Sequence, residues 1–172
     1  MEHAVKPLSR KDIRSYARFI RKLENSDQEY YFDIMNFMEC TLPAVYPDFT
    51  LSVGTVEELG ECHGLTYLNQ KEIKLREDVY NGAISGNGRD RLTVAHELFH
   101  LLVHSNEPIA FARTTASKIP AYMNSEWQAD AFGGELLVPY HLASGLTVEE
   151  IIEKCGVSRT AAICQYKKMH GM

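Results

Sequence analysis

The residues best suited to chemistry form an H-E-x-x-H motif, His96-Glu97-Leu98-Phe99-His100, inside a segment with helical periodicity. Residues four apart lie on one face of a helix, about 6 Å from each other, so both imidazoles can bind one metal ion. Glu97 lies about 100° further round the helix and is poorly placed as a third ligand. Its carboxylate can instead take a proton from a water molecule bound to the metal. The motif therefore predicts a zinc site with Glu97 as the general base.

A catalytic zinc site needs a third protein ligand, and two candidates follow in the sequence. His104 continues the series of histidines, but it lies about 12 Å along the helix axis from His96, too far to share the ion. We expect it at the helix C-terminus, where a His interacts well with the helix dipole. Glu126 opens the next predicted helix, and Asp130 shares its face four residues later. Glu126 is therefore the predicted ligand and Asp130 the predicted acceptor for the N–H of a ligating imidazole, although Glu126 alone could equally be a surface carboxylate.

The elements that carry these residues follow from hydrophobic periodicity and from helix start and stop signals. The strongest segment, 90–104, is apolar around most of its circumference and is expected as a buried helix. Gly82, Gly86 and Gly88 precede it in a polar loop that lacks the pattern of a phosphate-binding loop. The other expected elements are strands over 49–56, 64–68 and 73–75, a loop over 105–124, and helices after Ser9, over 30–40 (ending before Pro43), over 125–138 and on both sides of Gly156. This order of helices, small sheet and helices indicates the α+β class.

Length and composition are those of one soluble globular domain. The 172 residues are 45% hydrophobic and 24% charged, which excludes disorder as the global description. We expect N-terminal helices (1–45), a core with the sheet and the zinc site (46–140), and a C-terminal helical hairpin (141–172). No apolar run reaches the roughly 20 residues of a membrane span, and residues 1–10 contain no signal-peptide core. The four scattered cysteines form neither a zinc knuckle nor a disulfide pattern, so we expect a cytoplasmic protein.

Charge is distributed unevenly along the chain. Residues 1–24 contain seven basic and three acidic side chains, and because the whole chain has a net charge of -5, the remainder has a net charge of -9. The basic residues from Lys11 to Arg21 recur at helical spacing and predict a solvated face that also neutralises the acidic body. The alternative is a docking surface for an acidic partner or for nucleic acid. The acidic body argues against general binding of nucleic acid.

The tail, 147–172, is similar to a helix-turn-helix, with Gly156 at the turn and Ser158 as the cap of a second helix. It contains four basic and three acidic residues, whereas a DNA-reading helix is normally strongly basic. We therefore expect a structural or partner-docking hairpin here, and no direct contact with DNA.

Two stretches of the chain carry paired motifs. The first is R-D-R-L-T-V-A-H-E-L-F-H-L-L-V-H at 89–104, and the second is E-x-x-A-D-x-F at 126–132, followed by E-L-L-V-P at 135–139. Together they resemble the signature of the ImmA/IrrE family of zinc metallo-endopeptidases, over roughly residues 70 to 140.

The resemblance implies a zincin fold with a gluzincin-like core, in which a small twisted three-stranded sheet lies beside the metal helix. It makes His96, His100 and Glu126 the ligands of one Zn²⁺ per chain, and Glu97 the catalytic base. Such enzymes cut helix-turn-helix repressors encoded beside them, on mobile elements, in prophages or in stress systems. We therefore expect a repressor or antitoxin protein as the substrate or partner.

The chain departs from the family pattern at Phe99, where Gly is usual, and at Gly133-Gly134, where alanines are usual. Phe99 is expected to add bulk beside the metal helix and to narrow the substrate groove. The paired glycines cost roughly 2 kcal/mol in a helix, which indicates a close approach of another helix or of substrate; a loosely packed helix end is the alternative.

Two questions stay open at the level of sequence. The alternative to an enzyme is a module that holds zinc and sequesters a repressor or antitoxin without cutting it, and the intact Glu97 favours the enzyme. A peptidase also needs a group that stabilises the oxyanion. Tyr122 and His141 are candidates only because they flank the second motif, and we favour an ordinary packing or surface role for each.

Overall fold

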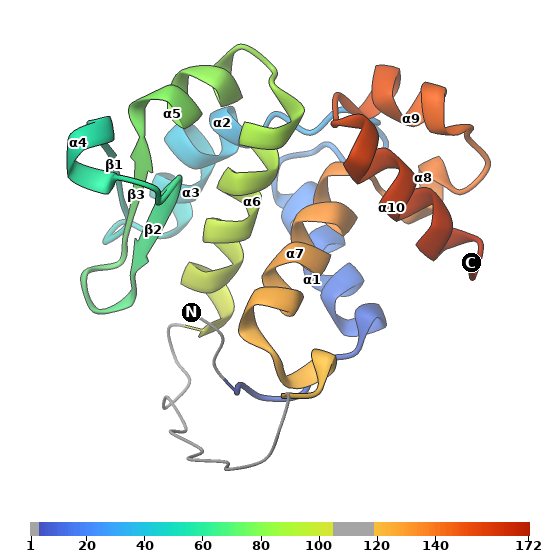
Figure 1. Cartoon of the computed structure of the whole chain (residues 1–172), viewed down its shortest axis with the longest axis horizontal. Coiled ribbons are helices and arrows are strands. Elements are labelled where there is room, and N and C mark those ends of the chain that lie inside the picture. The colour runs from blue at the N-terminus through green and yellow to red at the C-terminus, as the bar shows by residue number, and fades with distance from the viewer. Residues whose placement is uncertain (1–3, 105–118) are drawn as a thin grey trace.

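The computed structural model describes residues 4–104 and 119–172. A small sheet lies on one side of a central helix, α6 (Gly88–Val103), and several other helices lie on its opposite side (Figure 1). The predicted α+β class, with a three-stranded sheet against the H-E-x-x-H helix, is confirmed. None of the helices in the described ranges is long and apolar enough to cross a bilayer. Most of the predicted loop over 105–124 lies outside the described residues.

The sheet contains β1 (Thr50–Gly54), β2 (Gly64–Tyr67) and β3 (Glu72–Arg76), in the order β1-β3-β2. The central strand β3 pairs parallel with β1 and antiparallel with β2, and a short 3₁₀ turn joins it to β2. Its apolar residues Ile73 and Leu75 are fully buried. The edge strand β2 lies against α6, so the rim of the sheet is next to the H-E-x-x-H helix.

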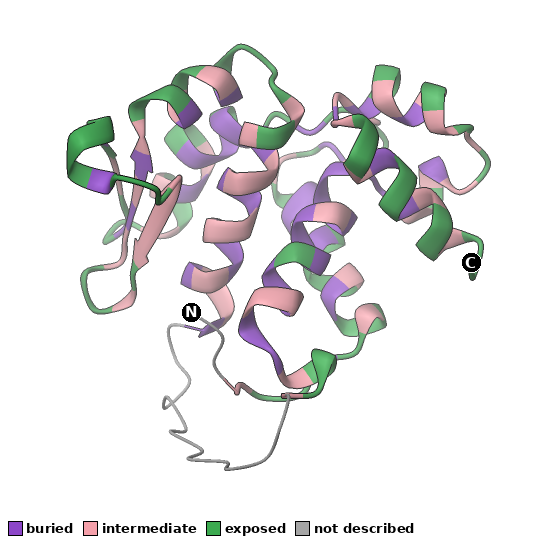
Figure 2. Cartoon of the chain, in the orientation of Figure 1, coloured by how far each residue is buried: buried purple, intermediate pink, exposed green. Residues whose placement is uncertain are grey.

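Helices α6 and α7 (Ser125–Leu137) run antiparallel side by side and form the centre of the buried core (Figure 2). Each begins at an asparagine whose side chain accepts hydrogen bonds from the first turn. A Cβ atom on Gly133 would lie only 2.8 Å from Leu92 Cδ1, and one on Gly134 would lie 2.8 Å from the Gln165 amide carbon. The paired glycines therefore serve the close approach of neighbouring helices.

Phe99 does not add bulk beside the metal cluster, contrary to the expectation from the sequence. Its side chain is fully buried, and its ring centroid lies 4.7 Å from that of Phe132 and 6.2 Å from that of Tyr16. Phe99 is next to His100 in sequence, but on a helix this rotates it by about 100°, into the core between α6, α7 and α1.

Helix α1 (Arg10–Leu23) begins with the capping box of Ser9 and Asp12, as the sequence predicted. Two of its basic residues, however, are paired with a buried carboxylate. Arg10 and Arg14 each lie 2.8 Å from a carboxylate oxygen of Glu135, whose side chain is only 2% exposed. The basic face therefore packs α1 onto α7, and it neutralises the body more than it presents charge to solvent.

Two further arginines, Arg21 and Arg91, are buried and donate mainly to backbone carbonyls. Arg21 donates to the carbonyls of Ser26, Glu29, Tyr30 and Leu136. Arg91 donates to the carbonyls of Phe32, Cys155 and Gly156. Burial lowers the pKa of Arg21 to about 10, which leaves it charged at neutral pH. These cations join segments that are distant in the sequence, and Arg91 docks the C-terminal hairpin onto α6.

The segment predicted as a helix over 30–40 is shifted along the chain. It consists of α2 (Ile34–Asn36), a π-helical turn (Phe37–Thr41) and α3 (Leu42–Val45). Pro43 does not end the helix, because it lies at the start of α3, where a missing N–H costs little.

The C-terminal part contains α8 (Tyr140–Ala143), α9 (Val148–Cys155) and α10 (Arg159–Met169), and the last two form the predicted hairpin around a left-handed Gly156. Besides α8, sequence reasoning missed α4 (Val56–Leu59) and α5 (Glu77–Ile84), the second of which takes up part of the expected glycine loop.

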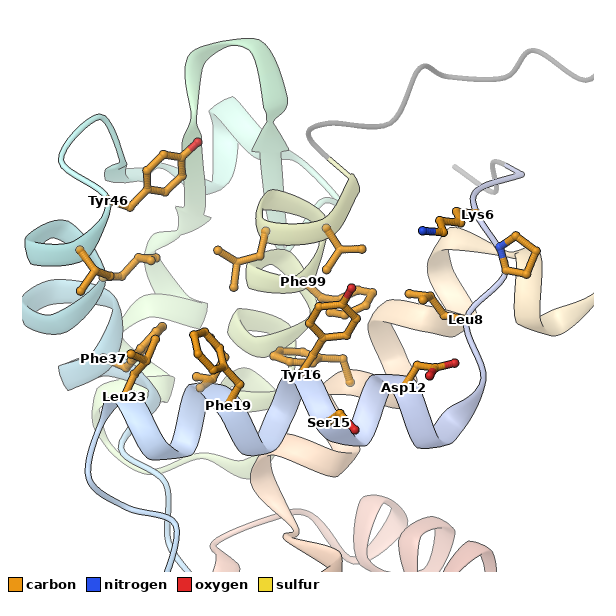
Figure 3. A pocket seen from close by; sticks show the side chains of 17 residues that line it. Lys6, Leu8, Asp12, Ser15, Tyr16, Phe19, Leu23, Phe37, Tyr46 and Phe99 are labelled. Atoms are coloured by element: carbon orange, nitrogen blue, oxygen red, sulfur yellow. The ribbon is translucent and has the colours of Figure 1, made fainter.

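An apolar hollow of about 960 Å³ lies between α1, α3 and the C-terminal half of α6 (Figure 3). Tyr16, Phe19 and Leu23 of α1 form one wall, Tyr46 lies on the opposite side, and Phe37 also lines the hollow. Tyr16, Phe19 and Leu23 are all more than a third exposed. We call this feature the α1 groove.

Candidate metal centre

His96 and His100 lie one turn apart on α6, and Glu126 reaches them from the first turn of α7. His96 Nε2 is 3.0 Å from His100 Nε2 and 3.3 Å from Glu126 Oε2, and His100 Nε2 is 3.6 Å from Glu126 Oε1. The structure thus brings together the three residues predicted as ligands, with donor atoms within 4.8 Å of one another. Their binding of zinc stays a prediction.

The spacing of these donor atoms fits a tetrahedral metal site. With zinc–ligand bonds of about 2.0–2.1 Å, neighbouring ligand atoms of a tetrahedron lie about 3.3 Å apart. The separations of 3.0, 3.3 and 3.6 Å bracket this value. The three side chains are between 16% and 34% exposed, so the cluster is partly open to solvent. Two imidazoles and one carboxylate also match the ligand sets of hydrolytic zinc sites, which leave the fourth position for water.

Carboxylates surround the two imidazoles and set the charge of the site. Burial alone would lower the pKa of His96, but hydrogen bonds to Asp130 and Glu126 outweigh burial and raise it to about 9. The hydrogen bond from His96 in turn lowers the pKa of Glu126. Burial, together with the charge of His96, lowers the pKa of His100. The carboxylates around the two imidazoles therefore favour a positive charge at this place.

Glu97 lies beside the cluster and is held by the edge strand β2. The Thr66 hydroxyl donates to Glu97 Oε2 at 2.6 Å. Burial raises the pKa of Glu97, while the Thr66 hydrogen bond and the charge of His96 partly oppose this. A raised pKa suits a carboxylate that must accept a proton near neutral pH. Gly64 allows the close approach of β2, because a Cβ atom there would lie 2.9 Å from Glu97 Cγ.

Asp130 lies where the sequence placed it, next to one of the imidazoles. His96 Nδ1 donates to Asp130 Oδ1 at 2.8 Å. In the neutral ring that binds a metal, a proton on Nδ1 leaves the lone pair of His96 on Nε2, which faces His100 and Glu126.

His104 caps the C-terminus of α6, as expected, and the structure adds a contact that sequence reasoning missed. His104 Nδ1 lies 2.9 Å from His100 Nδ1, on the side of the ring away from the cluster. The four-residue spacing between His100 and His104 could have predicted this contact, but we considered His104 only as a direct ligand of the metal.

The two oxyanion candidates lie at opposite ends of α7. Tyr122 is in a 3₁₀ turn (Ala121–Met123) just before Glu126, and it is 50% exposed. His141 lies beyond the other end, about 16 Å along the axis from Glu126, and its Nε2 is 2.7 Å from the Asp27 carbonyl oxygen. His141 is therefore too distant to act at the cluster, and Tyr122 stays a prediction.

A hollow of about 570 Å³ opens beside Asp130, between α6, α7 and α10. Leu92 and Trp127 contribute apolar surface, and Arg89 and Lys168 contribute positive charge. Asp130, which contacts His96, is the residue of the site that lines this hollow, and the hollow offers room for a side chain of a bound peptide.

Comparison with known proteins agrees with this site. Residues 79–161 match the IrrE N-terminal-like domain, a peptidase family, and the matched range includes α6, α7 and the C-terminal hairpin up to the start of α10. A search of curated proteins finds no match. The two motifs, their convergence on one cluster and this match over residues 79–161 support membership of the ImmA/IrrE family of peptidases.

Proposed function

We propose that this protein is a zinc-dependent endopeptidase. The observation that carries the proposal is the convergence of His96, His100 and Glu126 on one point, with Glu97 partly buried beside them. The donor spacing fits Zn²⁺, and the two imidazoles and Glu126 would hold it. When bound, zinc supplies a Lewis acid that polarises a peptide carbonyl and lowers the pKa of water.

The role that we assign to Glu97 is proton transfer. It accepts the proton of the attacking water and returns it to the leaving amine. The hydroxyl of Thr66 occupies Oε2, so Oε1 is the oxygen assigned to this transfer. Asp130 keeps His96 in the orientation needed for binding the metal. A module that only sequesters a partner would need no base held in this way.

The substrate is proposed to bind as an extended segment. The edge strand β2 contacts the base through Thr66, and an extended peptide can pair with an edge strand by backbone hydrogen bonds. A peptide in this position passes the cluster, and the hollow beside Asp130 can receive one of its side chains.

We further propose a helix-turn-helix repressor or antitoxin as the substrate. Such proteins have basic surfaces, and the body of this chain, residues 25–172, has a net charge of -9. Arg10 and Arg14 are paired with Glu135, and Arg18 lies 3.2 Å from a carboxylate oxygen of Asp27. These pairs leave the N-terminal helix little free charge for nucleic acid, which favours a protein partner.

The test compares the zinc-loaded wild type with Glu97→Gln on two substrates: a peptide library derived from a bacterial proteome, and the regulator encoded next to this chain. Mass spectrometry should detect cleavage by the wild type and none by Glu97→Gln at equal zinc content. Stable binding of the regulator without cleavage by the wild type would instead favour sequestration.

A further inference from the structure

A chain of hydrogen bonds leads from His100 away from the metal cluster into the interior. His100 Nδ1 lies 2.9 Å from His104 Nδ1, and His104 Nε2 lies 3.1 Å from Gln128 Oε1. The Gln128 amide nitrogen donates to the backbone carbonyls of Lys6 at 2.9 Å and Tyr122 at 2.8 Å. His104 is 6% exposed and Gln128 is fully buried. This series of hydrogen bonds thus connects His100, a predicted metal ligand, to the backbone at Lys6 and Tyr122.

The two carbonyls determine the direction of every hydrogen bond in this chain. Carbonyl oxygens only accept, so the amide nitrogen of Gln128 must face them and its Oε1 must face His104. His104 Nε2 therefore carries a hydrogen, and in a neutral ring Nδ1 then has the lone pair. His100 must donate from Nδ1, which leaves the lone pair on His100 Nε2, the atom that faces His96 and Glu126.

We infer that His104 and Gln128 are positioning residues that hold His100 in its metal-binding tautomer and orientation. The inference rests on the proposed metal site, because its effect is exerted on a predicted ligand. The counterpart at His96 is Asp130, whose side chain is 71% exposed. The two imidazoles are thus oriented by different means: an exposed carboxylate for His96, and a buried neutral chain for His100.

The backbone around Lys6 and Tyr122, where this series of hydrogen bonds ends, also holds the start of α7. Val5 N donates to the Met123 carbonyl and Leu8 N to the Tyr122 carbonyl, both at 2.9 Å. The N-terminal residues 4–8 therefore pair with the segment that leads into Glu126, and through Gln128 they also bear on His100. Ligands from two helices are supported by one short backbone segment.

The experiment measures the zinc dissociation constant by competition with a chelator, the visible absorption of the Co²⁺-substituted chain, and the thermal unfolding of the metal-free chain. His104→Phe keeps a ring in place and Gln128→Met keeps the side-chain volume, but both remove the hydrogen bonds. Each should weaken zinc binding by about 10- to 100-fold and change the Co²⁺ spectrum. His104→Asn should lose less, because its Oδ1 can take the place of Nδ1 as the acceptor.

The matched control is Gln165→Met, the same substitution at a buried glutamine that accepts a hydrogen bond from Arg10. It should lower the unfolding temperature without changing zinc affinity or the Co²⁺ spectrum. Wild-type zinc affinity and spectrum in both His104→Phe and Gln128→Met would overturn the inference. Absence of zinc binding by the wild type would overturn the proposed function itself, and the inference with it.

Discussion

The two sides of α6 differ in chemistry more than in shape. On one side, His96, His100 and Glu97 meet polar partners at distances between 2.6 and 3.6 Å. On the other side, Phe99 and its neighbours border the α1 groove, a hollow of about 960 Å³ with mostly apolar walls (Figure 3). The hollow beside Asp130, on the same side as the metal cluster, is smaller, about 570 Å³. The larger hollow therefore lies on the side of α6 without the candidate ligands.

In this protein, therefore, the volume of a hollow does not indicate where the groups that could carry out a reaction lie. The charged residues lining the α1 groove are Lys6 and Asp12, and the Asp12 carboxylate accepts hydrogen bonds from Ser9. A groove of this kind contributes to packing, whereas a site of reaction needs converging titratable groups. The predictions below test whether the two sides of α6 are as independent as this comparison implies.

The largest effect is expected from Glu126→Ala, because it leaves only two protein ligands. The variant should lose its zinc and all cleavage, whereas the wild type holds one zinc ion per chain. Metal analysis after dialysis against the same zinc buffer measures this, with His96→Ala as the parallel case. Full zinc retention in Glu126→Ala would mean that another residue is the third ligand, and Asp130 would be the first residue to examine.

Glu97→Gln should slow cleavage by about 10²- to 10⁴-fold while zinc content stays unchanged, because an amide cannot accept the proton of water. Thr66→Val, which removes the hydroxyl that holds Glu97, should reduce the rate less. The measurement is the rate of peptide cleavage at saturating zinc. A rate equal to wild type in Glu97→Gln would exclude Glu97 as the base.

On the other side of α6, Phe37→Ala should destabilise the fold without altering the metal centre. Phe37 is fully buried, and removal of such a ring costs about 3–5 kcal/mol in the free energy of unfolding. Urea denaturation measures that loss, and chelator competition on the folded variant measures zinc affinity. A parallel fall in zinc affinity would show that the two sides of α6 are coupled.

Gly64→Ala should reduce cleavage by about 10-fold, because the new Cβ atom must displace the Glu97 side chain. Zinc content should not change. Gly145→Ala is the matched control, since nothing lies within 4 Å of a Cβ atom there. Equal cleavage rates for both variants would mean that Glu97 tolerates a shift of β2.

The smallest effect is expected from Phe19→Ala, in the wall of the α1 groove. Phe19 is 58% exposed, so the free energy of unfolding should change by less than about 0.5 kcal/mol, and peptide cleavage should stay at the wild-type rate. A clear loss of cleavage would mean that the α1 groove takes part in binding the peptide.

Much of the local structure could be predicted from short stretches of the chain. Ser9 with Asp12 predicted the start of α1, and the periodicity of 90–104 predicted α6 to within two residues of its observed bounds. The prediction that a helix ends before Pro43 was wrong, because a π-helical turn shifts the register and leaves Pro43 at the start of a new helix. The pairing of Arg10 and Arg14 on α1 with the buried Glu135 was not predicted, because Glu135 lies far from α1 in the sequence.

For the candidate site, the sequence by itself determined which residues meet: His96 and His100 by their helical spacing, and Glu126 with Asp130 by theirs. Only the tertiary structure decided what holds them. Thr66 and Gly64 beside Glu97, and His104 with Gln128 behind His100, belong to segments separated by more than 20 residues from at least one partner. Helical periodicity and caps act over a few residues, so they specify elements. Contacts such as these depend on how complete elements pack, which no short pattern encodes.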